Sequence, residues 1–138
     1  MKFYTIGYGG RVPHQLVSLL TERGIKAVID VRLRPNRSSM GAYAKAKEPA
    51  RGIQGLLTKA GIQYFSVVEL GNIFLETEDW AERYRRLIER AGDLLTERLK
   101  QVPEPFCLLC AEKRVAECHR RVIAEFLLAG GAEVEHIE

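Results

Sequence analysis

A cysteine followed closely by ionisable side chains is the feature of this sequence best suited to chemistry. Glu112 comes two residues after Cys110. A second group of reactive side chains begins eight residues after Cys110 and consists of Cys118, His119 and Arg120. A thiolate is a strong nucleophile, and a nearby imidazole, guanidinium or helix amino terminus stabilises it. We therefore expect Cys110 to act as a nucleophile with Glu112 as a proton carrier. A buried, unreactive thiol is the alternative.

Two more polar groups stand where apolar runs stop. Asp30 and Arg32 come at the end of one run, and Gly7 and Tyr8 follow another. In open parallel sheets, ligands bind outside the carboxyl ends of the strands. We expect these groups to share one pocket with Cys110, and Asp30 to be a second candidate proton carrier. A structural ion pair between Asp30 and Arg32 is the competing interpretation.

A long segment without helical or strand periodicity, residues 33–49, is rich in basic side chains. From Arg32 through Arg51 the chain has six bases and one acid, a net charge of +5. Such a segment suits an anionic small molecule or nucleic acid, and connections this long are usually functional or mobile. The residues expected to bind the ligand are Gly7, Tyr8, Arg32, Arg37, Ser38, Cys118, His119 and Arg120.

The three cysteines also raise the question of a metal site. Cys107, Cys110, Cys118 and His119 together offer three sulfurs and an imidazole, which is a donor set for zinc. Residues three apart in a strand point to opposite faces, so Cys107 and Cys110 cannot both reach one ion. We therefore expect no metal site, and we expect Cys107 to be a small buried hydrophobic residue.

The sequence also lacks the motifs of common cofactor sites. Val12 stands where the dinucleotide-binding pattern that Gly7 and Gly9 would begin needs its third glycine. A phosphate loop with Gly-Lys-Ser or Gly-Lys-Thr does not occur either. We expect no cofactor.

Apolar periodicity predicts alternating strands and helices. Short apolar runs predict strands at residues 3–6, 27–31, 62–67, 106–111 and 133–137. Amphipathic patterns predict one helix from Pro13 to just before Gly24 and others at residues 52–60, 78–100 and 118–129. This alternation is typical of an α/β fold with a mainly parallel sheet flanked by helices, in one compact three-layer domain over residues 1–138.

Length and composition limit the class of protein. The 138 residues are 46% hydrophobic and 28% charged, which fits one globular domain and excludes a disordered tail. No apolar stretch is long enough for a membrane span, and no signal peptide is evident, so we expect a cytoplasmic protein without a membrane partner. The net charge of +3 permits an anionic ligand but does not require nucleic acid.

Several short motifs, in order, resemble those of domain-of-unknown-function family 488. The matching residues are Thr5-Ile6-Gly7, Asp30-Val31-Arg32 with Pro35 and Ser38, Gly61-Ile62 with Tyr64, Leu70-Gly71, Cys110-Ala111-Glu112, Cys118-His119-Arg120 and His136-Ile137. The resemblance implies a compact α/β domain in the cytosol but supplies no reaction. Tyr8-Gly9 stands where a His-Ser pair is common in the family, and Asn72 replaces a common second glycine. A family histidine at position 8 is therefore absent.

Together these patterns favour a small enzyme, or an enzyme-like domain, that acts on a phosphate-bearing ligand such as a nucleotide or a nucleic-acid end. In this hypothesis Arg32, Arg37 and Arg120 hold the anion and Cys110 attacks it. One alternative is a noncatalytic nucleic-acid-binding module in which residues 32–51 follow the phosphates. Another is a thiol redox switch formed by Cys110 and Cys118.

Overall fold

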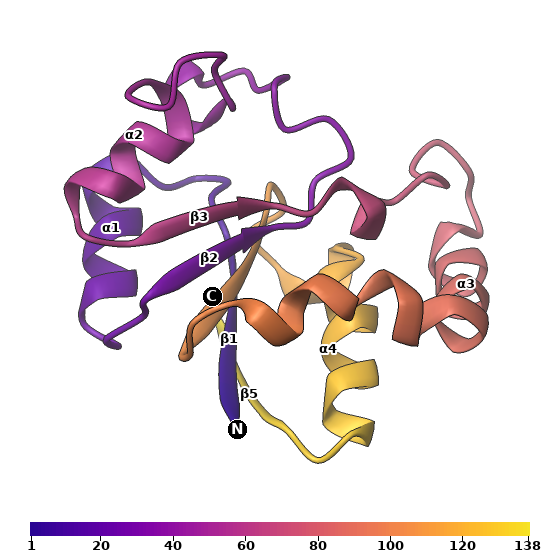
Figure 1. Ribbon diagram of the computed structural model, residues 1–138. Coiled ribbons are helices and arrows are strands. Elements are labelled where there is room, and N and C mark those ends of the chain that lie inside the picture. The colour runs from indigo at the N-terminus through magenta and orange to yellow at the C-terminus, as the bar shows by residue number, and fades with distance from the viewer.

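The computed structural model describes residues 1–138 and contains a five-stranded sheet in which all paired strands are parallel (Figure 1). The strands are β1 (Lys2–Gly7), β2 (Ala27–Asp30), β3 (Gln63–Ser66), β4 (Phe106–Cys110) and β5 (Glu133–Ile137). Their spatial order is β3-β2-β4-β1-β5. The predicted α/β class is confirmed, and the sheet is wholly rather than mainly parallel.

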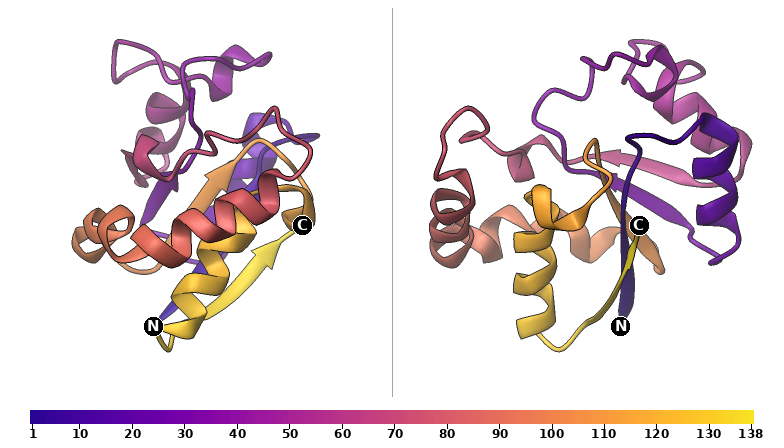
Figure 2. Two further views of the ribbon diagram at one scale, coloured as in Figure 1. Left: turned by 90° about the vertical axis from the view of Figure 1, so that its right-hand side faces the viewer. Right: turned by 180° about the vertical axis from the view of Figure 1, so that it is seen from behind.

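Four α-helices cover the two faces of the sheet. They are α1 (Pro13–Thr21), α2 (Gly52–Lys59), α3 (Trp80–Leu95) and α4 (Arg120–Ala129). Helices α1 and α2 pack on one face, and α3 and α4 pack on the other, which gives three layers (Figures 1 and 2). Right-handed crossovers explain this division, because the chain steps in one direction from β1 through β2 to β3 and then reverses through β4 to β5.

Strand β4 lies in the middle of the sheet and contributes side chains to both cores. Phe106, Leu108 and Cys110 belong to the core under α3 and α4. Cys107 and Leu109 belong to the core under α1 and α2. The prediction that Cys107 and Cys110 face opposite sides of their strand is therefore confirmed.

The predicted helix boundaries differ from the observed ones in two places that matter for the site. Helix α3 ends at Leu95, and a 3-10 helix over Glu97–Gln101 continues the amphipathic pattern. The Thr96 hydroxyl donates to the Gly92 carbonyl at 2.7 Å where α3 ends. Helix α4 begins at Arg120 and not at residue 118, so Cys118 and His119 lie just before its first turn.

The long connection between β2 and α2 contains no α-helix or strand, as expected. Its only helical element is a 3-10 turn, Gly41–Tyr43, which lies beside α2 (Figure 1). Tyr43 is fully buried, and its hydroxyl donates to the Arg11 carbonyl at 2.7 Å. This buried ring anchors the connection to the body of the domain.

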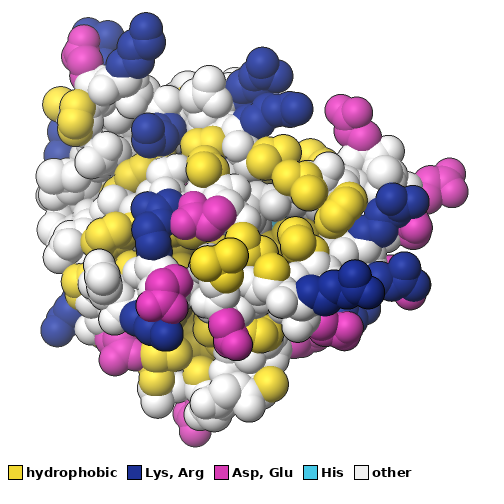
Figure 3. Space-filling model, turned by 45° about the vertical axis from the view of Figure 1, so that its right-hand side comes forward, with side chains coloured by type: hydrophobic (Ala, Val, Ile, Leu, Met, Phe, Trp, Pro, Cys, Tyr) yellow, Lys and Arg dark blue, Asp and Glu magenta, His cyan; other side chains and the backbone are white.

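The surface carries mixed charges. On the face shown in Figure 3, Lys and Arg side chains form separate groups with Asp and Glu between them, and hydrophobic side chains gather across the centre. On this face, therefore, the basic side chains do not form one continuous stripe. A separate finding concerns membranes: no helix is both long enough and apolar enough to cross one.

Candidate functional site

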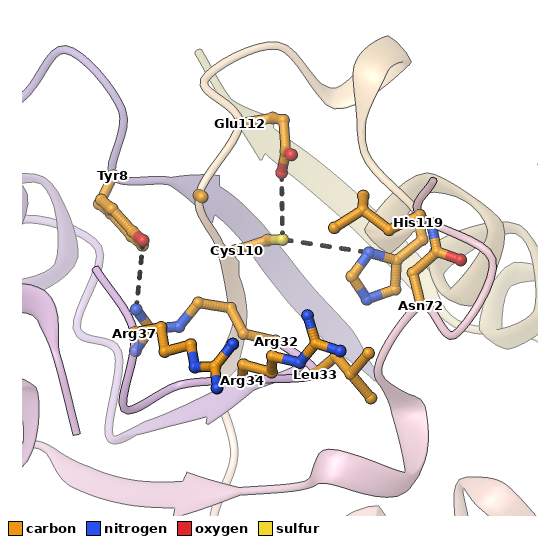
Figure 4. A pocket seen from close by; sticks show the side chains of 11 residues that line it. Tyr8, Arg32, Leu33, Arg34, Arg37, Asn72, Cys110, Glu112 and His119 are labelled. Atoms are coloured by element: carbon orange, nitrogen blue, oxygen red, sulfur yellow. Dashed lines mark hydrogen bonds between the residues drawn. The ribbon is translucent and has the colours of Figure 1, made fainter. Parts of the chain in front are cut away.

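A cavity of about 250 Å³ lies at the carboxyl ends of β1, β2 and β4 (Figure 4). The chain leaves the adjacent strands β1 and β4 toward opposite faces of the sheet, and this divergence opens a crevice in parallel α/β folds. The lining residues are Tyr8, Arg32, Leu33, Arg34, Arg37, Asn72, Leu75, Cys110, Ala111, Glu112 and His119. Six of the expected site residues therefore line one cavity: Tyr8, Arg32, Arg37, Cys110, Glu112 and His119.

Asp30 does not line this cavity, because it lies fully buried beneath Arg32. Its carboxylate accepts hydrogen bonds from the Arg32 Nε at 2.9 Å, the Arg32 Nη2 at 2.7 Å, the Arg32 backbone N–H at 3.1 Å and the Tyr64 hydroxyl. Four donors leave this carboxylate no place for a substrate proton. The structural ion pair is the correct interpretation, and the expected role of Asp30 as a proton carrier has no geometric support.

The same network fixes Arg32 at the cavity wall. Burial alone would lower the pKa of Arg32, but the Asp30 carboxylate raises it above its usual value. The Arg32 Nη1 donates to the Tyr8 hydroxyl at 3.2 Å, and its guanidinium carbon lies 5.1 Å from the centre of the Tyr8 ring. Burial, and then the charge of Asp30, raise the pKa of Tyr64. Arg32 is thus permanently charged, and Asp30 already neutralises most of that charge.

Arg120 also takes a different place from the one expected. Its guanidinium is fully buried and donates to the Glu112 carbonyl at 2.6 Å, the Lys113 carbonyl at 3.0 Å and the Thr5 hydroxyl at 3.3 Å. Arg120 therefore holds the loop that follows β4 and does not reach a ligand in the cavity. The expectation that it binds an anion has no support in the structure, because the guanidinium is fully buried and each of its three nitrogens donates to a group within the protein.

Gly7, another expected binding residue, permits the close approach of this loop. A Cβ atom at Gly7 would lie 1.7 Å from the Glu112 carbonyl oxygen. Gly7 does not line the cavity. Ser38 lies outside it too, and accepts a long hydrogen bond of 3.5 Å from the Tyr8 hydroxyl. Gly7 therefore acts through the loop that carries Glu112, and Ser38 contacts the lining through the Tyr8 hydroxyl.

The reactive wall of the cavity centres on Cys110. Its thiol donates to the Glu112 Oε2 at 3.3 Å and lies 4.0 Å from the His119 Nδ1 (Figure 4). Cys118 lies behind His119, with its Sγ 3.8 Å from the same Nδ1, and is buried away from the cavity. The predicted meeting of Cys110, Glu112 and the start of α4 is therefore present, with Cys118 behind the lining.

The position of the His119 ring is set by its other nitrogen. The His119 Nε2 lies 2.8 Å from the Val31 carbonyl oxygen. A carbonyl oxygen only accepts hydrogen bonds, so Nε2 carries a proton, and in the neutral ring Nδ1 is the lone-pair nitrogen. The imidazole also packs edge-to-face with the Tyr84 ring, with the ring centres 5.1 Å apart, and this contact helps to fix its orientation. This lone pair points toward both sulfurs.

The amino end of α4 contacts Cys118, whereas we expected it to stabilise a thiolate on Cys110. The Arg120 backbone N–H donates to the Cys118 Sγ at 3.4 Å. Burial alone would raise the pKa of Cys118, but hydrogen bonds with Cys110 and His119 and the nearby positive charges lower it. The hydrogen bond with Cys118, followed by burial and the negative charges of Cys118 and Glu112, raises the pKa of Cys110. Our expectation that this helix end lowers the pKa of Cys110 is therefore wrong.

Sequence reasoning missed several lining residues. Arg34 lines the cavity, but the sequence did not predict it as a binding residue. Its position in the basic segment, residues 32–51, could have indicated it. Asn72 is buried, and its Oδ1 accepts the Phe74 backbone N–H at 3.0 Å. Leu33 and Leu75 form an apolar side of the cavity that no pattern in the sequence indicated.

Two side chains of the cavity wall, together with Cys118 behind them, have the composition of a metal donor set. The Sγ atoms of Cys110 and Cys118 and a ring nitrogen of His119 all lie within 4.8 Å of one another. All three residues are buried, and all three cysteines of the chain are free thiols. Cys107 faces the opposite side of the sheet and cannot join them.

Comparison with known families gives one match. Residues 13–127 match the model of a family described as "Domain of unknown function DUF488". The matched range contains every lining residue of the cavity except Tyr8. Neither a curated protein nor a solved structure matches the chain.

Proposed function

Because the chain belongs to the DUF488 family, a family without an assigned reaction, we propose its function from the site: an enzyme that binds a phosphate-bearing ligand in the cavity and uses Cys110 as nucleophile. The observation that carries the proposal is the placement of the Arg34 and Arg37 side chains opposite Cys110 and His119 across one cavity (Figure 4). Three free cysteines also support a reducing, cytoplasmic compartment.

The anion-binding side of the proposal rests on Arg34 and Arg37. Both side chains are exposed, and neither has a hydrogen bond or a salt bridge within the protein. Arg32 is already paired with Asp30, so it adds little net charge to the cavity. A planar guanidinium binds two oxygens of a phosphate at once. Arg34 and Arg37 are therefore the side chains free to hold the phosphate of a ligand.

The nucleophile side rests on access and on the fixed imidazole. Of the three cysteines, only Cys110 lines the cavity. His119, with Nε2 held by Val31, offers its Nδ1 lone pair to the thiol, which is the arrangement of nucleophile, base and orienting group seen in thiol enzymes. The proton of Cys110 passes to His119, sulfur bonds to the electrophilic atom of the substrate, and the leaving group takes that proton as its own bond breaks. Glu112, also in contact with the thiol, can hold the proton instead.

The two alternatives make different use of the same residues. A nucleic-acid-binding module would use the unpaired bases Arg34, Arg37, Lys45 and Lys47, and its affinity would fall steeply with salt. On the face shown in Figure 3 the basic side chains form separate groups, and this separation favours a small ligand over a long phosphate backbone on that face. A thiol switch would need only Cys110 and Cys118, and would not depend on Arg37.

The test measures whether phosphate protects Cys110 from alkylation. Reduced protein is treated with iodoacetamide, with and without inorganic phosphate, and the modified cysteines are mapped by mass spectrometry. We expect Cys110 to react and Cys107, fully buried, to stay unmodified. Phosphate should slow the reaction of Cys110 in the wild type and in the control Arg90→Ala, an exposed arginine of α3, but not in Arg37→Ala.

Turnover completes the test. A set of phosphate esters, including nucleotides and nucleic acids with terminal phosphates, is assayed with the wild type and with Cys110→Ala. Protection by phosphate that is the same in Arg37→Ala as in the wild type would contradict the proposal. Salt-dependent binding of nucleic acid that is unchanged in Cys110→Ala, without turnover, would support the binding module instead.

A further inference from the structure

We propose that Cys110, Cys118 and His119 bind a soft divalent cation, Zn²⁺, as a three-ligand site that leaves one coordination position facing the cavity. The inference goes beyond the proposed function, because it concerns a ligand of the thiols and not of the arginines. It also revises the expectation of no metal site, which was derived for a set that included Cys107.

The donor atoms have the separations that a tetrahedral ion needs. Zinc bonds of about 2.3 Å to sulfur and about 2.0–2.1 Å to nitrogen place neighbouring ligands roughly 3.6–3.8 Å apart. The His119 Nδ1 lies 3.8 Å from the Cys118 Sγ and 4.0 Å from the Cys110 Sγ. Closing these two separations requires movements of a few tenths of an ångström, and the third pair, the two Sγ atoms, lies within 4.8 Å.

The atoms behind the donors are arranged as in metal sites. A metal-bound histidine generally donates its second ring N–H to a carbonyl or carboxylate, and His119 directs Nε2 to the Val31 carbonyl at 2.8 Å. The Cys118 Sγ accepts the Arg120 backbone N–H at 3.4 Å, a contact that stabilises a thiolate ligand. The imidazole therefore already has the orientation in which Nδ1 is the ligand atom.

One side of this cluster is open. Cys110 and His119 line the cavity, whereas Cys118 lies behind them. Two cysteines and one histidine with a free fourth position are one of the donor sets of catalytic zinc sites, whereas structural sites use four protein ligands. The Glu112 carboxylate lines the same cavity and lies 3.3 Å from the Cys110 Sγ.

The two functions of Cys110 exclude each other at any moment. A sulfur that coordinates zinc is not free to attack a substrate or an alkylating reagent. The metal-bound form is therefore a form of the protein in which the thiol chemistry of Cys110 is blocked, and the metal-free form is the one used in the alkylation test above.

The test titrates reduced, chelator-treated full-length protein with Co²⁺ and then Zn²⁺. We expect one Co²⁺ per chain, with a thiolate-to-cobalt charge-transfer band and the intense visible bands of a tetrahedral ion, and displacement by one Zn²⁺. Zn²⁺ should also prevent alkylation of Cys110. Cys118→Ser and His119→Gln should each weaken binding by more than about tenfold, because changes to outer-shell partners alone typically weaken it by about 10–100-fold.

Cys107→Ser is the matched control and should bind both ions like the wild type, since its sulfur faces the other core. Circular dichroism of each metal-free variant verifies that it is folded, and His119→Gln decides the outcome if Cys118→Ser is not. Absence of stoichiometric binding, or unchanged binding in folded His119→Gln, overturns the site. Phosphate protection is measured without metal, so either proposal can fail while the other stands.

Discussion

Replacing Gly7 with alanine tests how the loop that carries Glu112 is held against β1. The new Cβ would lie 1.7 Å from the Glu112 carbonyl oxygen and 2.4 Å from the carbonyl carbon. Both obstacles are backbone atoms, so no side chain can rotate away. Gly7 is paired with Cys110 in the parallel sheet, which keeps β1 in place. The loop following β4 must therefore move.

The size of the effect follows from the contacts that this movement breaks. Ordinary contact begins at 3.4 Å, so the loop must shift by about 1.7 Å. The shift removes the 2.6 Å hydrogen bond from the Arg120 Nη1 to the Glu112 carbonyl, a charged bond contributing about 1.5–3 kcal/mol. Overpacking adds about 1–3 kcal/mol. We expect the free energy of unfolding to fall by about 2.5–6 kcal/mol, a large part of the roughly 5–15 kcal/mol typical of a domain.

Urea unfolding followed by circular dichroism measures this loss. Gly41→Ala is the control, because Gly41 is exposed and a Cβ atom there meets nothing within 4 Å. Gly41→Ala should change the unfolding free energy by no more than about 1 kcal/mol. If Gly7→Ala were as stable as Gly41→Ala, the close approach of the loop to β1 would be refuted. The explanation of why position 7 is a glycine would then fail with it.

Two further predictions concern buried polar groups. Asp30→Asn should lower the unfolding free energy by about 3–5 kcal/mol, because it leaves the buried Arg32 charge unpaired. Asp79→Asn, whose partner is Arg83 at the exposed start of α3, should cost less than about 1 kcal/mol, and equal losses would contradict the assignment of a buried pair. Burial, and then the charge of Arg120, lower the pKa of His136, although Glu138 and Glu125 act in the opposite direction. Protonation therefore favours the unfolded chain, so stability is fully present above the unfolded pKa of about 6.5 and is lost as the pH falls through the lower folded pKa. Denaturant unfolding between pH 7 and 5 should show a shallower decrease for His136→Gln than for the wild type, and an identical decrease would disprove this role, with the exposed His14→Gln as control.

The sequence alone determined the layers of this protein and the edge at which chemistry is placed. Apolar runs and amphipathic repeats depend on the local period of the chain, so they predicted all five strands and four helices to within a few residues. The same alternation predicted that Cys107 and Cys110 lie on opposite faces of their strand. It also located the ends of β1, β2 and β4, and with them Tyr8, Arg32 and Cys110.

Only the tertiary structure decided which polar side chains already have hydrogen-bond partners within the protein. Asp30 and Arg120 have the residue types of a proton carrier and an anion binder, but each is buried among hydrogen-bond partners within the protein. These partners include one side chain distant in sequence in each case, Tyr64 for Asp30 and Thr5 for Arg120. The contact between Cys118 and Cys110 depends on where the loop after β4 returns, and the Gly7 backbone and the buried Arg120 set that path. Such contacts join segments that no local pattern relates. They arise only when the sheet order brings β1, β4 and α4 together, and they decide which thiol faces the ligand and which lies behind it.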